Sequence, residues 1–296
     1  VGIELLPVKL GSPSVPMPGY DVQILDEGGH PVAPGELGAI AVKLPLPPGT
    51  LPTLWNAEER FKKSYLTTFP GYYETGDAGM KTITVENLVV AGWTARDRAA
   101  VDHHIEELAA LGVPAPSQVP LFYRLSAQLL TQVENVEFLG VEASGEVEPL
   151  LVDDGETLWL GLGSDHTDRK LESVSVAFSK QACAKPVARQ LWRFDELRNR
   201  LDDLALTSWI RDGDEAEWQL YQQGTLAAIR PLAELMATSP FARGERLAPG
   251  TAMMCGTFGA KGGVRPAGQF RMELVDHVTG RTISHSYRVK PLPVIA

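Results

Sequence analysis

Cysteines and basic runs are scarce in this sequence, and their scarcity excludes several classes of protein. Only two cysteines, Cys183 and Cys255, occur among 296 residues, each between small or apolar neighbours. We expect buried packing residues rather than a disulfide or a metal pair, which indicates a reducing compartment. No basic run is longer than Lys62-Lys63 and the formal charge is −10, so nucleic acid is not an expected partner.

Long apolar runs and a targeting signal are also missing. No apolar segment reaches the roughly 18 residues that a bilayer-spanning helix needs. The opening stretch VGIELLPVKL lacks the basic, apolar and cleavage regions of a signal peptide. We therefore expect a cytoplasmic protein with no membrane partner. The chain begins with valine, which is compatible with a fragment of a longer protein.

Glycine and proline are unevenly distributed, and their distribution divides the chain in two. Residues 1–79 contain turn signals such as PMPG, DEGG and APGELG, and the short alternating stretches YDVQIL and AIAVKL lie between them. This pattern predicts a small β-rich unit with a helix at NAEERFKKSY. At Met80 the stretch MKTITVENLVVAG begins, which we interpret as the first strand of an independent domain over residues 80–296.

Two long stretches of the first unit carry a family resemblance. They are GSPSVPMPGYDVQILDEGGHPVAPGELGAIAV and LWNAEERFKKSYLTTFPGYYETGD. They resemble the acyl-CoA synthetases of the adenylate-forming superfamily, in particular the acetyl- and propionyl-CoA type. The resemblance implies that Asp77, which ends YETGD, matches the aspartate that holds the ATP ribose. The phosphate-binding loop and the domain with the catalytic lysine are missing, so we expect a fragment without ligase activity and interpret Asp77 as a turn residue.

A helix is predicted over residues 98–114, RAAVDHHIEELAALGVP. Its apolar residues fall near helical spacing, and a glycine and a proline end it. His104 and Glu107 lie three residues apart on one face, where the carboxylate can polarise the imidazole to activate water. His103 and Glu106 have the same spacing, so the register of this pair stays open. A solvated helix face with a fortuitous pair is the other interpretation.

Two acidic residues lie on one face of a predicted strand, GEVEPLLV, residues 145–152. Glu146 and Glu148 are two residues apart, so their side chains point to the same side of the sheet. Neighbouring carboxylates repel one another unless a cation or a proton lies between them. The strand runs on into apolar residues, which favours a pair of oxygen ligands for Mg²⁺ or Mn²⁺. A solvent-facing edge strand is the alternative.

A polar stretch, SDHTDRK, follows the predicted strand TLWLGLG, and two lysines among small residues come after it. A third oxygen ligand fits at Asp165 or Asp168, with Arg169 and Lys180 as cations able to hold a carboxylate or a developing enolate. An ordinary surface loop is the alternative. His166 has no cysteine or second histidine at zinc-like spacing, so zinc is not expected.

Five elements follow one another in a fixed order over residues 80–296. They are the H-x-x-E helix, the E-x-E strand, the D-H-T-D-R stretch, a lysine, and a closing segment, LAPGTAMMCGTFGAKGGVRP followed by FRMELVDHVTGRTISHSYRV. In this order they resemble the fumarylacetoacetate hydrolase superfamily. The phrases GLGSDHTDRKLE and SKQACAKPVA are most similar to its bacterial DUF2848 branch. In the closing segment, Phe258 stands where the superfamily has a proline.

This second resemblance implies a fold, a cofactor and a set of roles. The fold is α+β and mainly β, a mixed β-sandwich or roll preceded by the small β-rich fragment, and the assembly is a homodimer. The roles carried over are Glu146, Glu148 and Asp165 as ligands of Mg²⁺ or Mn²⁺, Arg169 and Lys180 around the oxyanion and the substrate, Thr257 near the substrate carboxylate, and His104 with Glu107 activating water.

The function implied is a divalent-metal-dependent hydrolase of a 2-oxo or 2,4-dioxo acid. It would cleave a C–C bond of the acylpyruvate type through a metal-stabilised enolate, with a small carboxylic acid as substrate. Three alternatives stay open. They are a decarboxylase or isomerase on the same fold, a non-catalytic binder of a small acid, and a remnant acyl-CoA synthetase fragment.

Overall fold

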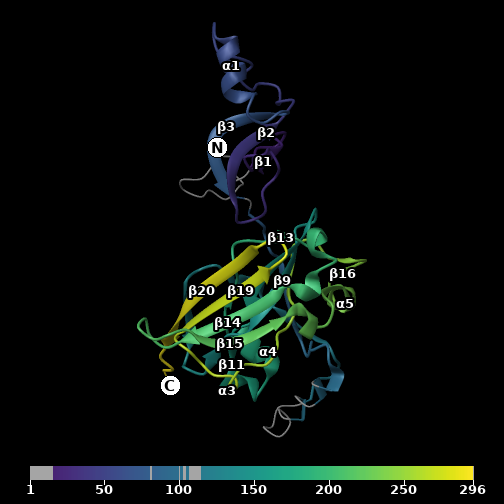
Figure 1. Ribbon diagram of the computed structural model, residues 1–296, viewed down its shortest axis with the longest axis vertical. Helices are drawn as coiled ribbons and strands as arrows, with labels where there is room; N and C mark the ends of the chain where they lie inside the picture. Colours follow the sequence, from purple (N-terminus) through teal and green to yellow (C-terminus); the bar gives the residue numbers. More distant parts are fainter. Residues whose placement is uncertain (1–15, 81, 100, 103–104, 107–114, 296) are drawn as a thin grey trace. The chain divides into compact units, whose positions relative to one another are not determined.

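The protein is represented by a computed structural model that describes residues 16–80, 82–99, 101–102, 105–106 and 115–295. The chain divides into two compact units, Val1–Thr82 and Ile83–Ala296 (Figure 1). Within the described residues, no helix has the length and apolarity that crossing a bilayer requires.

The first unit is a small antiparallel sheet with one helix in its described part. The sheet order is β1-β2-β3, and the elements are β1 Val22–Leu25, β2 Leu37–Lys43, α1 Glu58–Tyr65 and β3 Tyr72–Met80. Leu25, Ala41 and Phe69 form its core. Acidic residues begin α1 and lysines end it, which complements the helix dipole. The two strands and the helix expected in this unit are confirmed.

The strand expected from Met80 begins later in the chain. Met80 is the last residue of β3, where it pairs with Leu37. The first strand of the second unit is β4, Asn87–Gly92. It begins where its parallel neighbour begins, since Asn87 pairs with Thr251. The alternating residues after Met80 have strand propensity, but a strand forms only where a partner supplies the hydrogen bonds.

Two larger sheets form the second unit. In the described part of the chain one has the order β13-β10-β9-β18-β4-β5 and the other β15-β14-β19-β20-β7. The strands not yet bounded are β5 Leu121–Leu125, β7 Asn135–Leu139, β9 Val147–Asp153, β10 Leu158–Ser164, β13 Trp192–Arg193, β14 Ala205–Arg211, β15 Gln219–Thr225, β18 Thr251–Met254, β19 Gln269–Asp276 and β20 Arg281–Leu292. Figure 1 shows β14, β15, β19 and β20 side by side in one layer.

Shorter elements connect these sheets. Three two-stranded ladders join β8 Ala143–Ser144 to β11 Thr167–Asp168, β6 Leu130–Thr131 to β12 Lys185–Pro186, and β16 Ala242–Arg243 to β17 Arg246–Leu247. The described helices are α3 Arg169–Glu172, α4 Val176–Gln181 and α5 Leu232–Thr238, and the 3₁₀ turns are η1 Ala127–Leu129, η2 Phe194–Leu197, η3 Leu201–Asp203 and η4 Leu226–Ala228.

The burial of each strand follows its position in the sheets. Every residue of β9 and β10 is buried, because both faces of these strands are covered, and such strands contain near-continuous apolar runs. Strand β14 instead alternates buried and half-buried residues. Side chains from both sheets, such as Leu160 of β10 and Met272 of β19, share one core. The α+β, mainly β fold expected from the sequence is confirmed.

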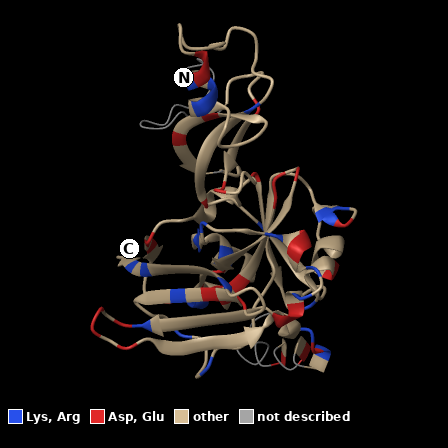
Figure 2. Cartoon of the chain, turned by 45° about the horizontal axis from the view of Figure 1, so that its top comes forward, with Lys and Arg blue, Asp and Glu red and all other residues tan. Residues whose placement is uncertain are grey.

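Acidic residues gather in the turn between β14 and β15, whereas charges of both signs alternate along neighbouring strands (Figure 2). Asp214 in this turn lies 2.6 Å from Arg288 and 3.7 Å from Arg211. These cations offset the repulsion among the carboxylates of the turn.

The hairpin of β19 and β20 depends on one buried carboxylate. Asp276, 1% exposed, accepts hydrogen bonds from the Thr279 hydroxyl at 2.7 Å, the Val278 N–H at 3.0 Å and Arg200 Nε at 3.1 Å. Burial alone would raise the pKa of Asp276, but these donors outweigh it, so the pKa lies below its ordinary value of 3.8. The ionised carboxylate therefore stabilises the fold.

We expect Asp276→Asn to lower the free energy of unfolding by about 1–3 kcal/mol at pH 7. The wild-type contribution is present above the unfolded-state pKa and is lost as the pH falls through the lower folded-state pKa. Urea unfolding at pH 7 and below pH 4 should show the difference shrinking in acid. The exposed Asp195→Asn is the control and should change little. An equal loss at every pH would contradict the assignment.

Candidate metal site

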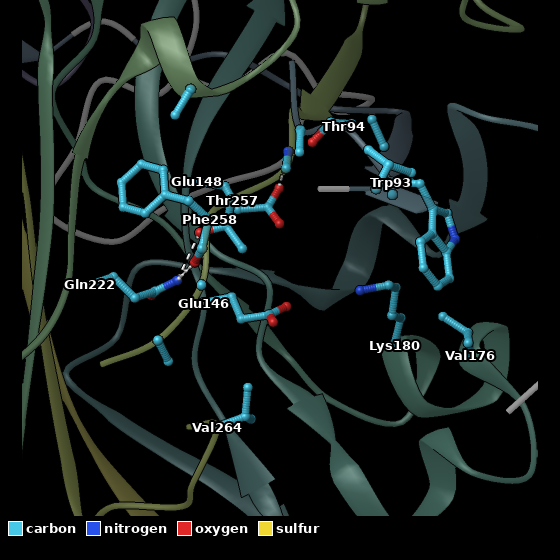
Figure 3. A pocket seen from close by; sticks show the side chains of 18 of the residues that line it. Trp93, Thr94, Glu146, Glu148, Val176, Lys180, Gln222, Thr257, Phe258 and Val264 are labelled. Atoms are coloured by element: carbon cyan, nitrogen blue, oxygen red, sulfur yellow. Dashed lines mark hydrogen bonds between the residues drawn. The ribbon is translucent and has the colours of Figure 1, made fainter. Parts of the chain in front are cut away.

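A cavity of about 1000 Å³ lies in the second unit, and Glu146 and Glu148 line it (Figure 3). Asp165 lies next to these two carboxylates and is fully buried. It is lined by the end of β4, the start of β9, helix α4 and the segment after β18. The apolar strands of the core therefore deliver polar groups to the cavity at the points where the strands begin or end.

The antiparallel pair β9 and β10 brings the three carboxylates together. Glu148 faces Gly163 in the ladder, and the Asp165 N–H donates to the Glu146 carbonyl at 3.0 Å. One ligand atom from each of Glu146, Glu148 and Asp165 lies within 4.8 Å of the others. We call these three residues the acidic triad. Sequence reasoning thus grouped the residues that the fold brings together.

The two alternative interpretations, a solvent-facing edge strand for Glu146 and Glu148 and a surface loop for the polar stretch, are both wrong. Strand β9 lies between β10 and β18, so it is not an edge strand. Ser164, Asp165, His166 and Thr167 are at most 1% exposed, so the polar stretch is not a surface loop. Asp168, the alternative third ligand, instead caps α3 by accepting from the Leu171 N–H at 2.8 Å.

Glu148 has the least compensated charge of the triad. It is 2% exposed, and it accepts a hydrogen bond from the Gly256 N–H at 2.7 Å. Among the described residues no ion pair joins it to a lysine or an arginine. Burial, and then repulsion by Asp165, raise the pKa of Glu148 well above its ordinary value. Its ionised form therefore needs another cation nearby.

Asp165 is compensated by two lysines. Lys180 Nζ on α4 donates to Asp165 Oδ2, and Lys185 Nζ lies 3.2 Å from Oδ1. Burial opposes ionisation, but the two ammonium charges lower the pKa of Asp165 to about 2. Burial would also lower the pKa of Lys180, yet Asp165 and Glu146 raise it above its ordinary value. Lys180 therefore holds its proton beside the acidic triad.

Arg169 also lies at the cavity, but its guanidinium is occupied. Its NH2 nitrogen lies 3.1 Å from Glu146 and its NH1 nitrogen donates to Glu172 at 3.0 Å. Its Nε donates to the Ser144 hydroxyl at 2.7 Å. Burial opposes its charge, but Glu146 and Glu172 raise the pKa of Arg169 further. In this arrangement Arg169 fixes the position of Glu146.

The segment after β18 is tied to β9 by a glutamine. Gln222, 1% exposed, donates to the Thr257 hydroxyl and the Phe258 carbonyl, both at 2.8 Å, and accepts from the Val147 N–H at 2.9 Å. Thr257 in turn donates its hydroxyl proton to the Val147 carbonyl at 2.6 Å. Gly256 has φ +91°, a left-handed conformation that aims its N–H at Glu148.

His166 lies behind the acidic triad. Its Nδ1 is 2.9 Å from the Tyr287 hydroxyl and its ring stacks on Phe138 at 4.0 Å between centroids. Burial, assisted by Lys185, lowers the pKa of His166 to about 3. The neutral ring therefore packs in the core.

Both cysteines, Cys183 and Cys255, are buried and free, so the packing role expected for them is confirmed.

The expected water-activating pair lies outside the described residues. This applies to His104 and Glu107, and to His103 of the other register. Glu106 is helical and exposed, and Val101 of the same segment is buried and lines the cavity. The neighbouring described residues 98, 99, 102 and 105 are also helical.

Sequence reasoning missed three residues that shape the site. They are Lys185, Gln222 and Trp93, and the sequence analysis assigns no role to any of them. Lys185 is fully buried and also donates to the carbonyls of His166 at 2.6 Å and Lys180 at 2.5 Å. A lysine among small residues, as in QACAKPVA, was the available signal for it. Nothing local distinguishes Gln222, because its partners are distant in sequence.

Comparison with known proteins places the chain in a family. A family model described as a protein of unknown function, DUF2848, matches residues 91–287. The chain belongs to the DUF2848 family. This match covers the acidic triad, both lysines and all but the last two residues of the closing segment, and it confirms the DUF2848 resemblance read from the sequence.

Solved structures show the fold that this DUF2848 protein adopts. A 2-keto-3-deoxy-D-arabinonate dehydratase complexed with magnesium and 2,5-dioxopentanoate matches with a TM-score of 0.51 at 15% identity, over 93% of this chain and 96% of that one. The structure of Cg1458 with inhibitor matches with a TM-score of 0.52 at 14% identity, over 75% and 85%. The dehydratase belongs to the fumarylacetoacetate hydrolase superfamily, so the fold resemblance is confirmed.

Curated relatives match a smaller part of the DUF2848 protein. An uncharacterized protein of Pseudomonas aeruginosa is 46% identical over 79 residues, 27% of this chain and 13% of that protein. An acetyl-coenzyme A synthetase of Pyrobaculum arsenaticum is 34% identical over 151 residues, 46% of this chain and 22% of the synthetase. The chain thus spans about a fifth or less of these relatives. The partial resemblance to short-chain acyl-CoA synthetases is confirmed.

The acidic triad fits a hard divalent cation. All its donors are carboxylate oxygens, which Mg²⁺ and Mn²⁺ prefer over the nitrogen and sulfur donors typical of zinc sites. Burial and the neighbouring Asp165 raise the pKa of Glu148, although Lys180 acts against them. A divalent cation bound by the acidic triad would favour the ionised form of Glu148.

We expect Glu148→Gln to separate stability from metal binding. Without metal the variant should be at least as stable as wild type, because the substitution removes a buried charge that repels Asp165. Wild type should gain roughly 5 °C or more in Tm at about 100 times the Kd of Mn²⁺. Differential scanning fluorimetry with and without Mn²⁺ measures both effects.

Glu172→Gln is the matched control for this measurement. Glu172 is also a cavity carboxylate, but it lies outside the acidic triad and pairs with Arg169. This variant should keep the Mn²⁺ shift that Glu148→Gln loses. If Glu148→Gln kept the full shift, the acidic triad would not be the metal site.

Proposed function

We propose that the second unit is a divalent-metal-dependent enzyme that processes a small 2-oxo acid. The observation that carries the proposal is the acidic triad, two of whose carboxylates line a large cavity, with a protonated lysine beside it. In solved relatives of this fold the dehydratase structure was obtained with magnesium and 2,5-dioxopentanoate, which supports a metal and an oxo compound as the ligand class.

Glu146, Glu148 and Asp165 would hold Mg²⁺ or Mn²⁺. When bound there, the ion would act as a Lewis acid toward the carboxylate and the neighbouring carbonyl of the 2-oxo acid. Other residues of the chain hold the three ligands in position. Arg169 fixes Glu146, Gly256 fixes Glu148, and the lysines fix Asp165.

We assign to Lys180 the role of stabilising and protonating an enolate. Its ammonium group points toward the carboxylates of Glu146 and Glu148 across the cavity (Figure 3). Its raised pKa keeps the ammonium group charged at neutral pH, and a positioned cation lowers the energy of a developing negative charge. Thr257 would act by fixing the segment beside the substrate carboxylate, because its hydroxyl proton is donated to the Val147 carbonyl.

For the reaction itself we propose hydrolysis of a C–C bond in a 2,4-dioxo acid. Water activated by His104 and Glu107 would add to the distal carbonyl. The C–C bond then breaks, its electron pair forms the enolate of the 2-oxo acid, and Lys180 transfers a proton to carbon, while the proton that His104 and Glu107 took from water restores the Lys180 ammonium group. Decarboxylation or isomerisation is the second candidate. It is favoured by Lys180, which supplies the proton for these reactions without any activated water.

The proposal is tested by metal calorimetry and turnover on the full chain. We expect one Mg²⁺ or Mn²⁺ site in wild type and none in Glu148→Ala, with Glu137→Gln on β7 as an exposed control. Acylpyruvates and oxaloacetate are then screened for cleavage by product chromatography. Absence of metal binding in wild type would overturn the metal-dependent function, and binding without turnover would leave a small-acid binder.

Analytical ultracentrifugation tests the homodimer, which remains a prediction.

We expect Lys180→Met to lower kcat by about 10²- to 10⁴-fold. Metal affinity should be kept or increased, because the substitution removes a positive charge next to the acidic triad. Steady-state kinetics and calorimetry separate the two effects. Lys170→Met on the exposed side of α3 is the control. An unchanged kcat would show that Lys180 serves only to hold Asp165.

A further inference from the structure

The cavity is larger and more apolar than a small acid requires. Its volume of about 1000 Å³ is at the upper end of the range for sites that enclose drug-sized ligands. Glu146, Glu148 and Lys180 lie together in it, and Arg96, Asp97, Arg169 and Glu172 are its other charged lining residues. The rest of the described lining is largely apolar and includes Trp93, Val101, Val176, Phe258, Ala260 and Val264.

Several of these apolar side chains lie on either side of the Glu146 and Glu148 carboxylates. In Figure 3, Trp93 and Val176 lie on the side of Lys180, and Phe258 lies beside Thr257 on the opposite side. Val264 lies apart from both groups in the same view. A 2-oxo acid anchored at the acidic triad would therefore extend its far end between apolar walls.

The wall at Trp93 is held in an uncommon backbone conformation. Trp93 has φ +62°, a left-handed conformation that non-glycine residues adopt at a cost in free energy. The flanking residue Thr94 is fixed, since its carbonyl accepts from the Arg230 N–H at 2.8 Å. Arg96 Nε also donates to the Ile229 carbonyl at 2.9 Å. The Trp93 indole is thus held at the cavity at a cost in the free energy of folding.

The wall at Phe258 is equally fixed. A Cβ at Gly224 would lie 3.0 Å from the Phe258 ring, so glycine at this position lets the ring approach the backbone of β15. Gln222 holds the Phe258 carbonyl at 2.8 Å. Both walls are therefore preformed rather than adjustable.

The cations of the described lining are already committed. Arg96 donates to both oxygens of Asp202, at 2.7 and 2.6 Å. Arg169 is shared between Glu146 and Glu172, and Lys180 pairs with Asp165. A second carboxylate at the far end of a substrate would be desolvated there, and the described residues offer it no free cation, so its burial is costly.

We propose that the substrate is a 2-oxo acid whose far end is a bulky apolar group, an aromatic ring or a chain of several carbons, and not a dicarboxylate. This inference rests on the proposed function. Trp93 and Phe258 set the preference by contacting the apolar end, while the acidic triad sets the requirement for the 2-oxo acid end.

Binding of a graded ligand series tests the inference. The full chain with saturating Mn²⁺ is titrated by calorimetry with oxalate, pyruvate, 2-oxopentanoate and 2-oxoheptanoate, and with 2-oxoglutarate as the dicarboxylate matched to 2-oxopentanoate. Affinity should rise about threefold to fourfold for each added methylene, or about 100-fold from pyruvate to 2-oxoheptanoate. 2-Oxoglutarate should bind more weakly than 2-oxopentanoate.

Two variants locate the preference. Trp93→Ala should weaken 2-oxoheptanoate at least tenfold and leave oxalate within about twofold. Trp55→Ala is the matched control, because Trp55 is 92% exposed and belongs to the first unit. Val264→Asp adds a charge at a cavity residue that is 50% exposed, where folding tolerates it, and it should also weaken only the long-chain acid.

The outcomes distinguish this inference from the proposed function. Equal affinity along the series, or tighter binding of 2-oxoglutarate, would overturn the apolar preference. If oxalate still bound only with Mn²⁺, the proposed function would stand. Loss of affinity for oxalate and 2-oxoheptanoate alike in both variants would assign these residues to folding and also overturn it. Failure of oxalate to bind with Mn²⁺ would overturn both proposals.

Discussion

The site depends on burying several charges beside an apolar core. Glu148 and Asp165 are almost fully enclosed, and the compensating charges of Lys180 and Lys185 are buried with them. Enclosed charges are tolerated only when partners and hydrogen bonds replace water, and removing one partner typically costs about 3–5 kcal/mol. The antiparallel pairing of β9 and β10 holds Glu148 in register, and just beyond it the Asp165 N–H donates to the Glu146 carbonyl. The acidic triad is therefore positioned by two fully buried strands.

The second layer of support comes from the closing segment. A Cβ at Gly256 would lie 1.7 Å from the Thr94 hydroxyl oxygen, so this position accepts glycine alone while its N–H holds Glu148. Gln222 of β15 joins the same segment to the start of β9. Both large sheets thus contribute to the position of one carboxylate. Catalytic precision of this kind comes from residues locked by packing on strands rather than from mobile loops.

Fold and chemistry remain separate questions in this chain. The second unit has the fumarylacetoacetate hydrolase fold, and that fold alone does not choose among hydrolysis, decarboxylation and isomerisation. The choice depends on which group handles water and which handles the proton. In the proposed function Lys180 handles the proton, and its position beside Asp165 and its positive charge support that role. The first unit resembles part of a synthetase, and its described core is a small cluster around Leu25, Ala41 and Phe69.

Local periodicity and turn residues were enough to predict the helix at NAEERFKKSY and to put Glu146 and Glu148 on one face of a strand. The mainly β class and Asp165 as the third member of the acidic triad followed from the order of motifs, through the resemblance to the fumarylacetoacetate hydrolase superfamily. Long-range contacts of the folded chain were needed to show that β9 is central, that Arg169 is committed to Glu146 and Glu172, and that Gln222 and Trp93 shape the cavity. The reason is physical. Strand pairing, burial and the partner of a charge depend on residues far apart in sequence, and a local pattern holds no information about them.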